Sequence, residues 1–241
     1  MIELVKVHKS YNGRVKAVDD LTLTVPAGEI VGFLGPNGAG KTTTLKLLTG
    51  ILNPDSGGIR VNGLDLHQEP IRVKEQIGFV PDSPDIFLRL KGIEYLRFMA
   101  DLYRVGGAER KARIEEYAGK FEMSEVLGDK IQSYSHGMRQ KIILIGALLH
   151  DPAVWILDEP LTGLDPKSSF LLKEMLRREA EKGKTVFFST HVLDVAEKLC
   201  DRVAIIHKGK LLFDGTITAM RDHFKANESL ERMFLEMTED E

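Results

Sequence analysis

The sequence predicts an α/β fold with a mostly parallel sheet, an antiparallel β segment at the N-terminus and an inserted helical segment. Short apolar runs alternate with longer helical patterns in both the first and the last third of the chain, as in successive β-α units. Between residues 84 and about 150 the apolar residues recur at helical spacing instead. At 241 residues, the chain is expected to form a single domain, residues 1–241, that carries this helical subdomain.

Residues 2–25 predict two antiparallel β segments, because apolar and polar residues alternate on each side of the turn Tyr11-Asn12-Gly13. Short strands are expected at 57–63 and 77–80, the second of them ended by a proline. Taken alone, Tyr11 is an aromatic residue at a turn, and this favours packing at a sheet edge over a platform for a base.

A glycine-rich stretch lies between a predicted buried strand, Glu29–Leu34, and a predicted helix that continues through Thr44–Thr49. It fits G-x-x-x-x-G-K-[ST], the P-loop pattern, in which backbone N–H groups and the helix N-terminus surround phosphate oxygens. The pattern places Lys41 on the β- and γ-phosphates and the Thr42 hydroxyl on Mg²⁺. The predicted nucleoside triphosphate site comprises Gly35, Pro36, Asn37, Gly38, Ala39, Gly40, Lys41, Thr42 and Thr43.

The segment from about 84 to 150 predicts helices at 92–103 and 108–119, separated by a pair of glycines. Ser135 is a candidate N-cap for a third helix that runs through Leu149. Apolar residues occupy most sides of this third helix after Gln140, so we expect it to be buried. The methionine and aromatic residues of the segment favour a packed core rather than a cofactor pocket.

The α/β pattern returns after residue 150. Strands are predicted at 153–157 and 185–189, helices at 166–182 and 191–200, and a hairpin at 202–207 and 210–213. Residues 222–241 are expected to form a charged helical tail.

Two acids end the strand at 153–157. A carboxylate at this place in a P-loop fold holds Mg²⁺, which is the role predicted for Asp158. Glu159 follows directly and is positioned to orient and polarise the attacking water. Read alone, two acids at a strand end are as typical of a solvated turn.

Composition limits the partners. Thirty-three lysines and arginines against 36 aspartates and glutamates give a net charge of −3, so nucleic acid is not an expected partner. The basic run Arg110–Arg113 favours a solvated helix face. Cys200 is the only cysteine, which indicates a reducing compartment. No apolar run approaches a membrane span, and the N-terminus lacks a signal-peptide pattern, so we expect a soluble chain.

Five motifs in order give the chain a resemblance to the ATP-binding cassette (ABC) ATPase family. They are the P-loop, the signature Ser135–Gln140 (SHGMRQ), the strand Val154–Glu159, the pair Leu164-Asp165, and His191 at the position of the switch histidine. By this resemblance Tyr11 stacks on adenine, and Val18 joins it among the nucleotide-binding residues. His191 is expected to hydrogen-bond the γ-phosphate, although a lone histidine is more often a structural or surface residue.

The resemblance also implies that two copies pack head to tail, so that Ser135 and the Gly137 N–H contact the γ-phosphate bound to the other copy. The chain departs from the family pattern in two places. Asp82 stands where glutamine usually touches Mg²⁺ and water, which puts its catalytic contribution in doubt. Tyr134 and His136 replace leucine and glycine in the signature, a form similar to that of ATPases serving small multispan exporters.

The resemblance therefore implies an ATP-hydrolysing subunit with ATP and Mg²⁺, working with a second ATPase subunit and a separate multispan membrane permease. Such a protein lies in the cytoplasm on the inner face of the membrane, and residues 82–103 are expected to contact the permease. An alternative is a non-transport ABC ATPase acting on nucleic acid, the ribosome or a cofactor-assembly scaffold. A regulatory module that binds ATP without hydrolysing it is a third reading, which Glu159 and His191 together disfavour.

Overall fold

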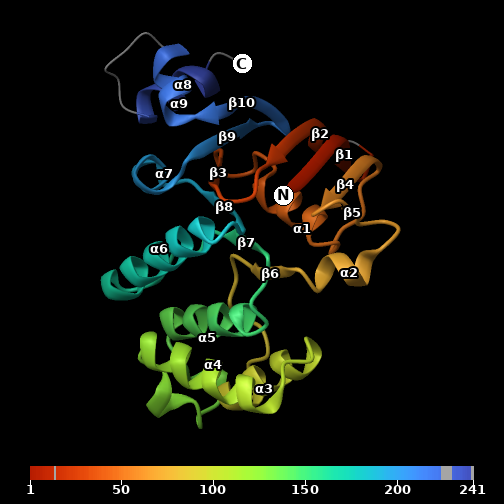
Figure 1. Ribbon diagram of the computed structural model, residues 1–241. Coiled ribbons are helices and arrows are strands. Elements are labelled where there is room, and N and C mark those ends of the chain that lie inside the picture. The colour runs from red at the N-terminus through yellow and green to blue at the C-terminus, as the bar shows by residue number, and fades with distance from the viewer. Residues whose placement is uncertain (14, 224–229, 240–241) are drawn as a thin grey trace.

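The computed structural model describes residues 1–13, 15–223 and 230–239, and it contains two β-sheets with helices packed around them (Figure 1). The larger sheet has six strands. All of its neighbouring strands run parallel except β9 and β10, which form the predicted hairpin. In spatial order the strands are β10 (Lys210–Thr216), β9 (Arg202–His207), β3 (Ile30–Leu34), β8 (Thr185–Thr190), β7 (Val154–Asp158) and β6 (Ile77–Val80).

This sheet separates two hydrophobic cores, because successive side chains of each strand point to opposite faces. In β7, Trp155 and Leu157 enter one core, and Val154 and Ile156 enter the other. Both faces are covered, which explains why the parallel strands read as continuous apolar runs rather than as alternating ones.

The smaller sheet is antiparallel and covers one face of the larger one, together with α1 (Lys41–Leu48). Its strands, in spatial order, are β2 (Val15–Val25), β1 (Ile2–Tyr11), β4 (Ser56–Val61) and β5 (Leu64–Asp65). Strand β5 and the short helix α2 (Pro70–Lys74) were not predicted. Neither is long enough to carry a recognisable hydrophobic period.

The inserted segment is helical, as predicted. It contains α3 (Gly92–Leu102), α4 (Gly107–Lys120), two 3₁₀ turns (Ser124–Val126 and Ile131–Ser133) and α5 (His136–Leu148). Figure 1 shows these helices at the end of the molecule opposite α8 and α9. Every residue of α5 from Gln140 to Leu148 is buried, so the expectation of a buried helix is confirmed.

Four more helices follow in the described part of the chain: α6 (Pro166–Glu181), α7 (Leu193–Leu199), α8 (Ile217–His223) and α9 (Leu230–Glu239). The helix predicted from 191 begins two residues later. The Thr190 hydroxyl accepts a hydrogen bond from Val192 N at 3.0 Å, a local turn that keeps His191 and Val192 outside the helix.

The end of the chain packs more closely than a charged tail would. Helix α9 lies against α7, and Met233 is fully buried in the core beneath it. Residues 224–229 and 240–241 of the predicted tail lie outside the described residues. Within the described part of the chain, no helix has the length and apolar character needed to cross a membrane.

Candidate nucleotide-binding site

The P-loop joins β3 to α1 and is held against two neighbouring segments of backbone. A side chain at Gly35 would collide with the Ile206 carbonyl of β9, and one at Gly40 would collide with the Ala17 carbonyl of β2. Gly40 also has a φ of 113°, which disfavours any residue with a Cβ atom. These two glycines are therefore required by close approach, and they bring the loop's N–H groups to the start of α1.

Lys41 lies inside this loop. Its ammonium group donates to the carbonyl oxygens of Gly35 at 2.6 Å and Pro36 at 3.2 Å, and the residue is only 7% exposed. Burial lowers the pKa of Lys41, whereas the nearby carboxylates of Glu159, Asp158 and Asp82 raise it. These three acids therefore compensate part of the cost of burying the ammonium.

Ser189 of β8 fixes both acids at the end of β7. Its hydroxyl donates to Asp158 Oδ1 at 2.5 Å and accepts from Glu159 N at 3.0 Å. The Asp158 residue is 1% exposed. Strands β7 and β8 therefore end at the same edge of the sheet. Asp158 is buried there, so it does not belong to a solvated surface turn.

Glu159 adopts an unusual backbone conformation, with a φ of 47°. Such left-handed geometry is uncommon for a residue other than glycine and tends to occur at functional sites. It presents the carboxylate to His191, whose Nδ1 lies 2.9 Å from Glu159 Oε1. A carboxylate oxygen accepts hydrogen bonds, so Nδ1 is the donor in this contact.

A cavity of about 390 Å³ brings these groups together. Most of the predicted site residues line it, including Tyr11, Asp82 and His191 from three separate segments. Two residues that the sequence analysis missed, Ala17 and Thr162, line it as well. Neither residue belongs to a recognised motif. Each lines the cavity only because the folded backbone brings it there.

Five predicted residues are not among those that line the cavity: Val18, Gly35, Ala39, Ser135 and Gly137. Val18 is buried in the core beneath β2, whereas its neighbour Ala17 lines the cavity. The alternation of a strand explains the difference, because adjacent residues face opposite sides. Gly35 contributes its carbonyl to Lys41, and Ala39 is buried.

The signature residues lie at the start of α5 instead. Ser135 is the N-cap of that helix, and its hydroxyl accepts from Met138 N at 3.3 Å. Lys141 of the same helix pairs with Asp165 at 2.7 Å and so ties the signature to the segment after β7. The pKa of Asp165 is lowered by this lysine and by hydrogen bonds from Ser168.

The two signature departures have packing roles. Tyr134 is buried, and its hydroxyl lies beside Gly92 and donates to the Val126 carbonyl at 2.6 Å. The His136 ring lies so close to Gly163 that a side chain there would collide with it. Neither substitution occupies the positions of Ser135 and Gly137.

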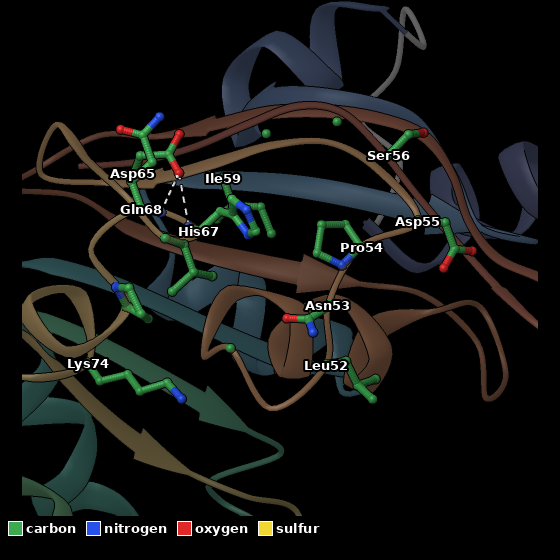
Figure 2. A pocket seen from close by; sticks show the side chains of 15 residues that line it. Leu52, Asn53, Pro54, Asp55, Ser56, Ile59, Asp65, His67, Gln68 and Lys74 are labelled. Atoms are coloured by element: carbon green, nitrogen blue, oxygen red, sulfur yellow. Dashed lines mark hydrogen bonds between the residues drawn. The ribbon is translucent and has the colours of Figure 1, made fainter.

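A second cavity, of about 480 Å³, lies away from the P-loop between β4 and α2 (Figure 2). Its walls include Pro54, Asp55, His67 and Lys74. None of the predicted nucleotide-binding residues lines it. The convergence of the P-loop, the strand-end acids and His191 is therefore specific to the first cavity.

Comparison with known proteins decides the family. Residues 18–162 match the family described as ABC transporter. The chain belongs to the ABC transporter family. It is 37% identical over 222 residues to the ABC transporter ATP-binding protein NatA of Bacillus subtilis, covering 92% of this chain and 90% of NatA. It is 36% identical to the daunorubicin/doxorubicin resistance ATP-binding protein DrrA of Streptomyces peucetius, covering 94% of this chain and 68% of DrrA.

Solved structures of ABC proteins share the fold. An ATP-binding subunit of an ABC transporter superposes with a TM-score of 0.93 at 32% identity, over 98% of this chain and 99% of that one. A dimeric ATP-binding cassette in a post-hydrolysis state, bound to ADP and Pi, gives 0.82 at 25% identity, over 90% of this chain and 99% of that one. The predictions of a P-loop α/β fold and of an ABC ATPase are confirmed.

Proposed function

We propose that this ABC ATPase binds and hydrolyses ATP to drive a separate membrane permease, in the direction of export. The observation that carries the proposal is the single cavity in which Lys41, Asp158, Glu159 and His191 meet around a P-loop. The names of NatA and DrrA, an ABC transporter protein and a drug-resistance protein, support transport and export respectively.

The chain's own groups divide the work of hydrolysis. Loop N–H groups and Lys41 bind the phosphates, and Tyr11 stacks on the base at the other end of the cavity. Glu159 orients the attacking water and accepts its proton, which is the role of a positioned carboxylate in phosphoryl transfer to water. His191 lines the same cavity, with Nδ1 2.9 Å from Glu159 Oε1, and a ring N–H of His191 donates a hydrogen bond to the γ-phosphate in this proposal.

The cavity also suits Mg²⁺. The Thr42 hydroxyl and the carboxylates of Asp82 and Asp158 are oxygen donors that line it, and oxygen is the ligand type that Mg²⁺ requires. No cluster of three acidic, histidine or cysteine side chains in the described residues forms a complete metal cage. This fits an ion held by one or two carboxylates with phosphate and water. When bound, Mg²⁺ would neutralise charge on the phosphate oxygens.

The position of the signature supports a dimer. Ser135 and Gly137 do not line the cavity of their own chain, so they are free to serve the cavity of a second copy packed head to tail. Dimeric cassettes among the structural neighbours support this arrangement. In it, Ser135 and the Gly137 N–H complete the binding of the γ-phosphate.

An aromatic surface on the helical segment is the proposed contact with the permease. Phe87 and Phe98 are each 44% exposed and their ring centroids lie 5.6 Å apart, and Leu102 nearby is 60% exposed. Exposed apolar groups gathered in one place mark interaction sites. The surface begins just after Asp82, so it links the cavity to the permease at the inner face of the membrane.

Mixing two inactive variants tests the shared site. Lys41→Ala removes the phosphate contact and Ser135→Ala removes the signature hydroxyl, so each variant alone should hydrolyse ATP slowly. A mixed dimer contains one doubly defective site and one site with both residues intact. We expect mixing to restore a substantial fraction of wild-type activity, measured as phosphate release against total protein. If the mixture is no more active than its components, the head-to-tail site is wrong.

Co-purification tests the permease contact separately. Phe98→Arg should leave ATP hydrolysis by the purified chain unchanged and abolish recovery of a near-equimolar multispan membrane protein in mild detergent. Lys111→Glu, on the surface of α4, is the matched control. Recovery of ribosomes, nucleic acid or a soluble scaffold in place of a membrane protein would contradict the transport role.

A further inference from the structure

Few contacts hold the Tyr11 side chain in place, although the proposed function requires it to stack on a base. Tyr11 ends β1, the residue is 41% exposed, and its hydroxyl lies 3.5 Å from Thr43 Oγ1, the outer limit of a hydrogen bond. The next two residues, Asn12 and Gly13, both have positive φ values and form a turn. The direction of the ring is therefore set chiefly by the backbone of β1 just before it.

That backbone is paired on one side only. On the β2 side the ladder continues to the pair Tyr11 and Val15. On the β4 side it ends at the pair His8 and Ser56. Beyond that pair, no strand among the described residues lies beside residues 9–11 on the β4 side, and β1 has register shifts on both sides of Lys9. A strand end that is irregular and paired on one side only needs a further contact to hold its conformation.

Asp55, the residue before β4, supplies this contact. Its Oδ2 accepts a hydrogen bond from Ser10 N at 2.7 Å, and its Oδ1 accepts from Lys9 Nζ at 2.8 Å. Its own N–H donates to the His8 carbonyl at 2.8 Å. One residue thus contacts three consecutive residues ahead of Tyr11. Figure 2 shows Asp55 at the rim of the second cavity, where Pro54 and Ser56 flank it.

The Asp55 carboxylate remains charged in this position. Hydrogen bonds from Lys9 and from the Ser10 N–H lower its pKa below the ordinary value, so it is ionised at neutral pH. Hydrogen bonds to a charged acceptor are stronger than those between neutral groups. The side chain therefore replaces the missing strand with a charge-assisted contact to the Ser10 backbone.

We propose that Asp55 is a positioning residue for base recognition, which holds the end of β1 so that Tyr11 lies against the adenine. The inference rests on the proposed function, because it requires that Tyr11 stacks on the base. It adds a residue from outside the cavity, since Asp55 does not line it. Its consequence is selective: loss of Asp55 affects binding of the base and leaves binding of the phosphates intact.

Equilibrium binding of two ligands to the full chain tests this selectivity. The ligands are ATP, which has a base, and inorganic tripolyphosphate, which has none. Asp55→Ala should raise the dissociation constant for ATP about fivefold and leave that for tripolyphosphate unchanged. Tyr11→Ala should raise the ATP value about tenfold, the range for removing one stacked base. Adding Asp55→Ala to Tyr11→Ala should cause no further loss, because both act through the same ring.

Two control variants separate positioning from general damage to the sheet. Asp65→Ala removes another carboxylate near β4, which accepts from the backbone of His67 and Gln68, and should leave both affinities unchanged. Lys9→Ala removes only the ion pair and keeps the bond to Ser10, so its effect should be less than twofold.

The outcomes distinguish this inference from the proposed function. If Tyr11→Ala weakens ATP binding and Asp55→Ala does not, the positioning role is wrong and the proposed site stands. Equal losses for ATP and tripolyphosphate in Asp55→Ala would also overturn it. If Tyr11→Ala binds ATP as tightly as the wild type, the base-stacking role fails, and the inference fails with it.

Discussion

The P-loop region and the signature region both lie at a helix N-terminus, yet only the first lines a cavity together with charged groups of the same chain. Around the P-loop, strand ends from the parallel sheet bring Lys41, Asp158 and Glu159 to one cavity. At the signature, Ser135 caps α5 and the Gly137 backbone follows it, with no acid or lysine of the cavity beside them. A parallel sheet gathers residues from distant parts of the sequence, whereas one helix N-terminus presents only its own first turn.

This difference gives the chain two kinds of functional residue. Those at the P-loop can be assayed in a single copy, by nucleotide binding. In the proposed head-to-tail dimer, those at the signature act only when a second copy is present. Predictions that separate binding from turnover therefore test the comparison directly.

The largest effect is expected from Glu159→Gln. The variant keeps the shape and the His191 contact but cannot accept a proton, so turnover should fall about 10³-fold with ATP affinity retained. Phosphate release and equilibrium ATP binding measure the two quantities, and Glu174→Gln on the exposed face of α6 is the control. Hydrolysis near the wild-type rate would remove Glu159 from its proposed role.

Ser135→Asp should lower turnover at least tenfold and leave ATP binding by the isolated monomer unchanged. Aspartate is as good an N-cap as serine, so α5 keeps its cap while its charge repels a γ-phosphate from the other copy. Steady-state hydrolysis, ATP affinity and thermal unfolding should be measured together. A wild-type rate would show that the signature does not meet phosphate, and Ser133→Asp in the preceding turn checks that the position matters.

A smaller effect is expected from Asp82→Asn. Removing one carboxylate from the proposed metal site should raise the Mg²⁺ concentration needed for half-maximal hydrolysis about tenfold, the lower end of the effect of losing a group that supports a bound metal. A titration of Mg²⁺ at saturating ATP measures it, with Asp129→Asn in the helical segment as the control. An unchanged Mg²⁺ requirement would mean that Asp82 does not act on the metal.

The last prediction concerns stability where the helical segment rejoins the sheet. His150 stacks on Tyr103 with a centroid distance of 3.6 Å, and burial lowers its pKa from 6.5 to about 4. The unfolded chain therefore binds this proton more readily, so stability is lost as the pH falls from about 6.5 towards 4. The loss should be about 1–3 kcal/mol from this group.

Urea unfolding at pH 7 and pH 4.5 measures that loss. His150→Gln should show a smaller decrease in unfolding free energy between the two pH values than the wild type does. Exposed His67→Gln should behave like the wild type, which separates burial from a general effect of removing histidine. Equal pH dependence in all three proteins would contradict the role of His150.

The sequence predicted most of the cavity because its motifs carry fixed geometry. A P-loop between an apolar strand and a helix has one way to fold, and the acids after β7 must end near it in a parallel sheet. The resemblance pointed to the segment around Val18, whereas strand alternation decides that Ala17 faces the cavity and Val18 faces the core. Ala17, Thr162 and Asp55 belong to no recognised motif, so only the tertiary structure could connect them with the cavity.

By itself, the sequence predicted most of the order of elements, the P-loop and a second helix N-terminus suited to an anion, because these depend on local pattern and spacing. Tertiary structure decided which sites share a cavity, that α9 packs on α7, and that the Asp55 carboxylate supports the strand end before Tyr11. These features depend on contacts between segments far apart along the chain. The periodicity of a sequence predicts which face of a segment is buried, but it does not predict which other segments that face contacts.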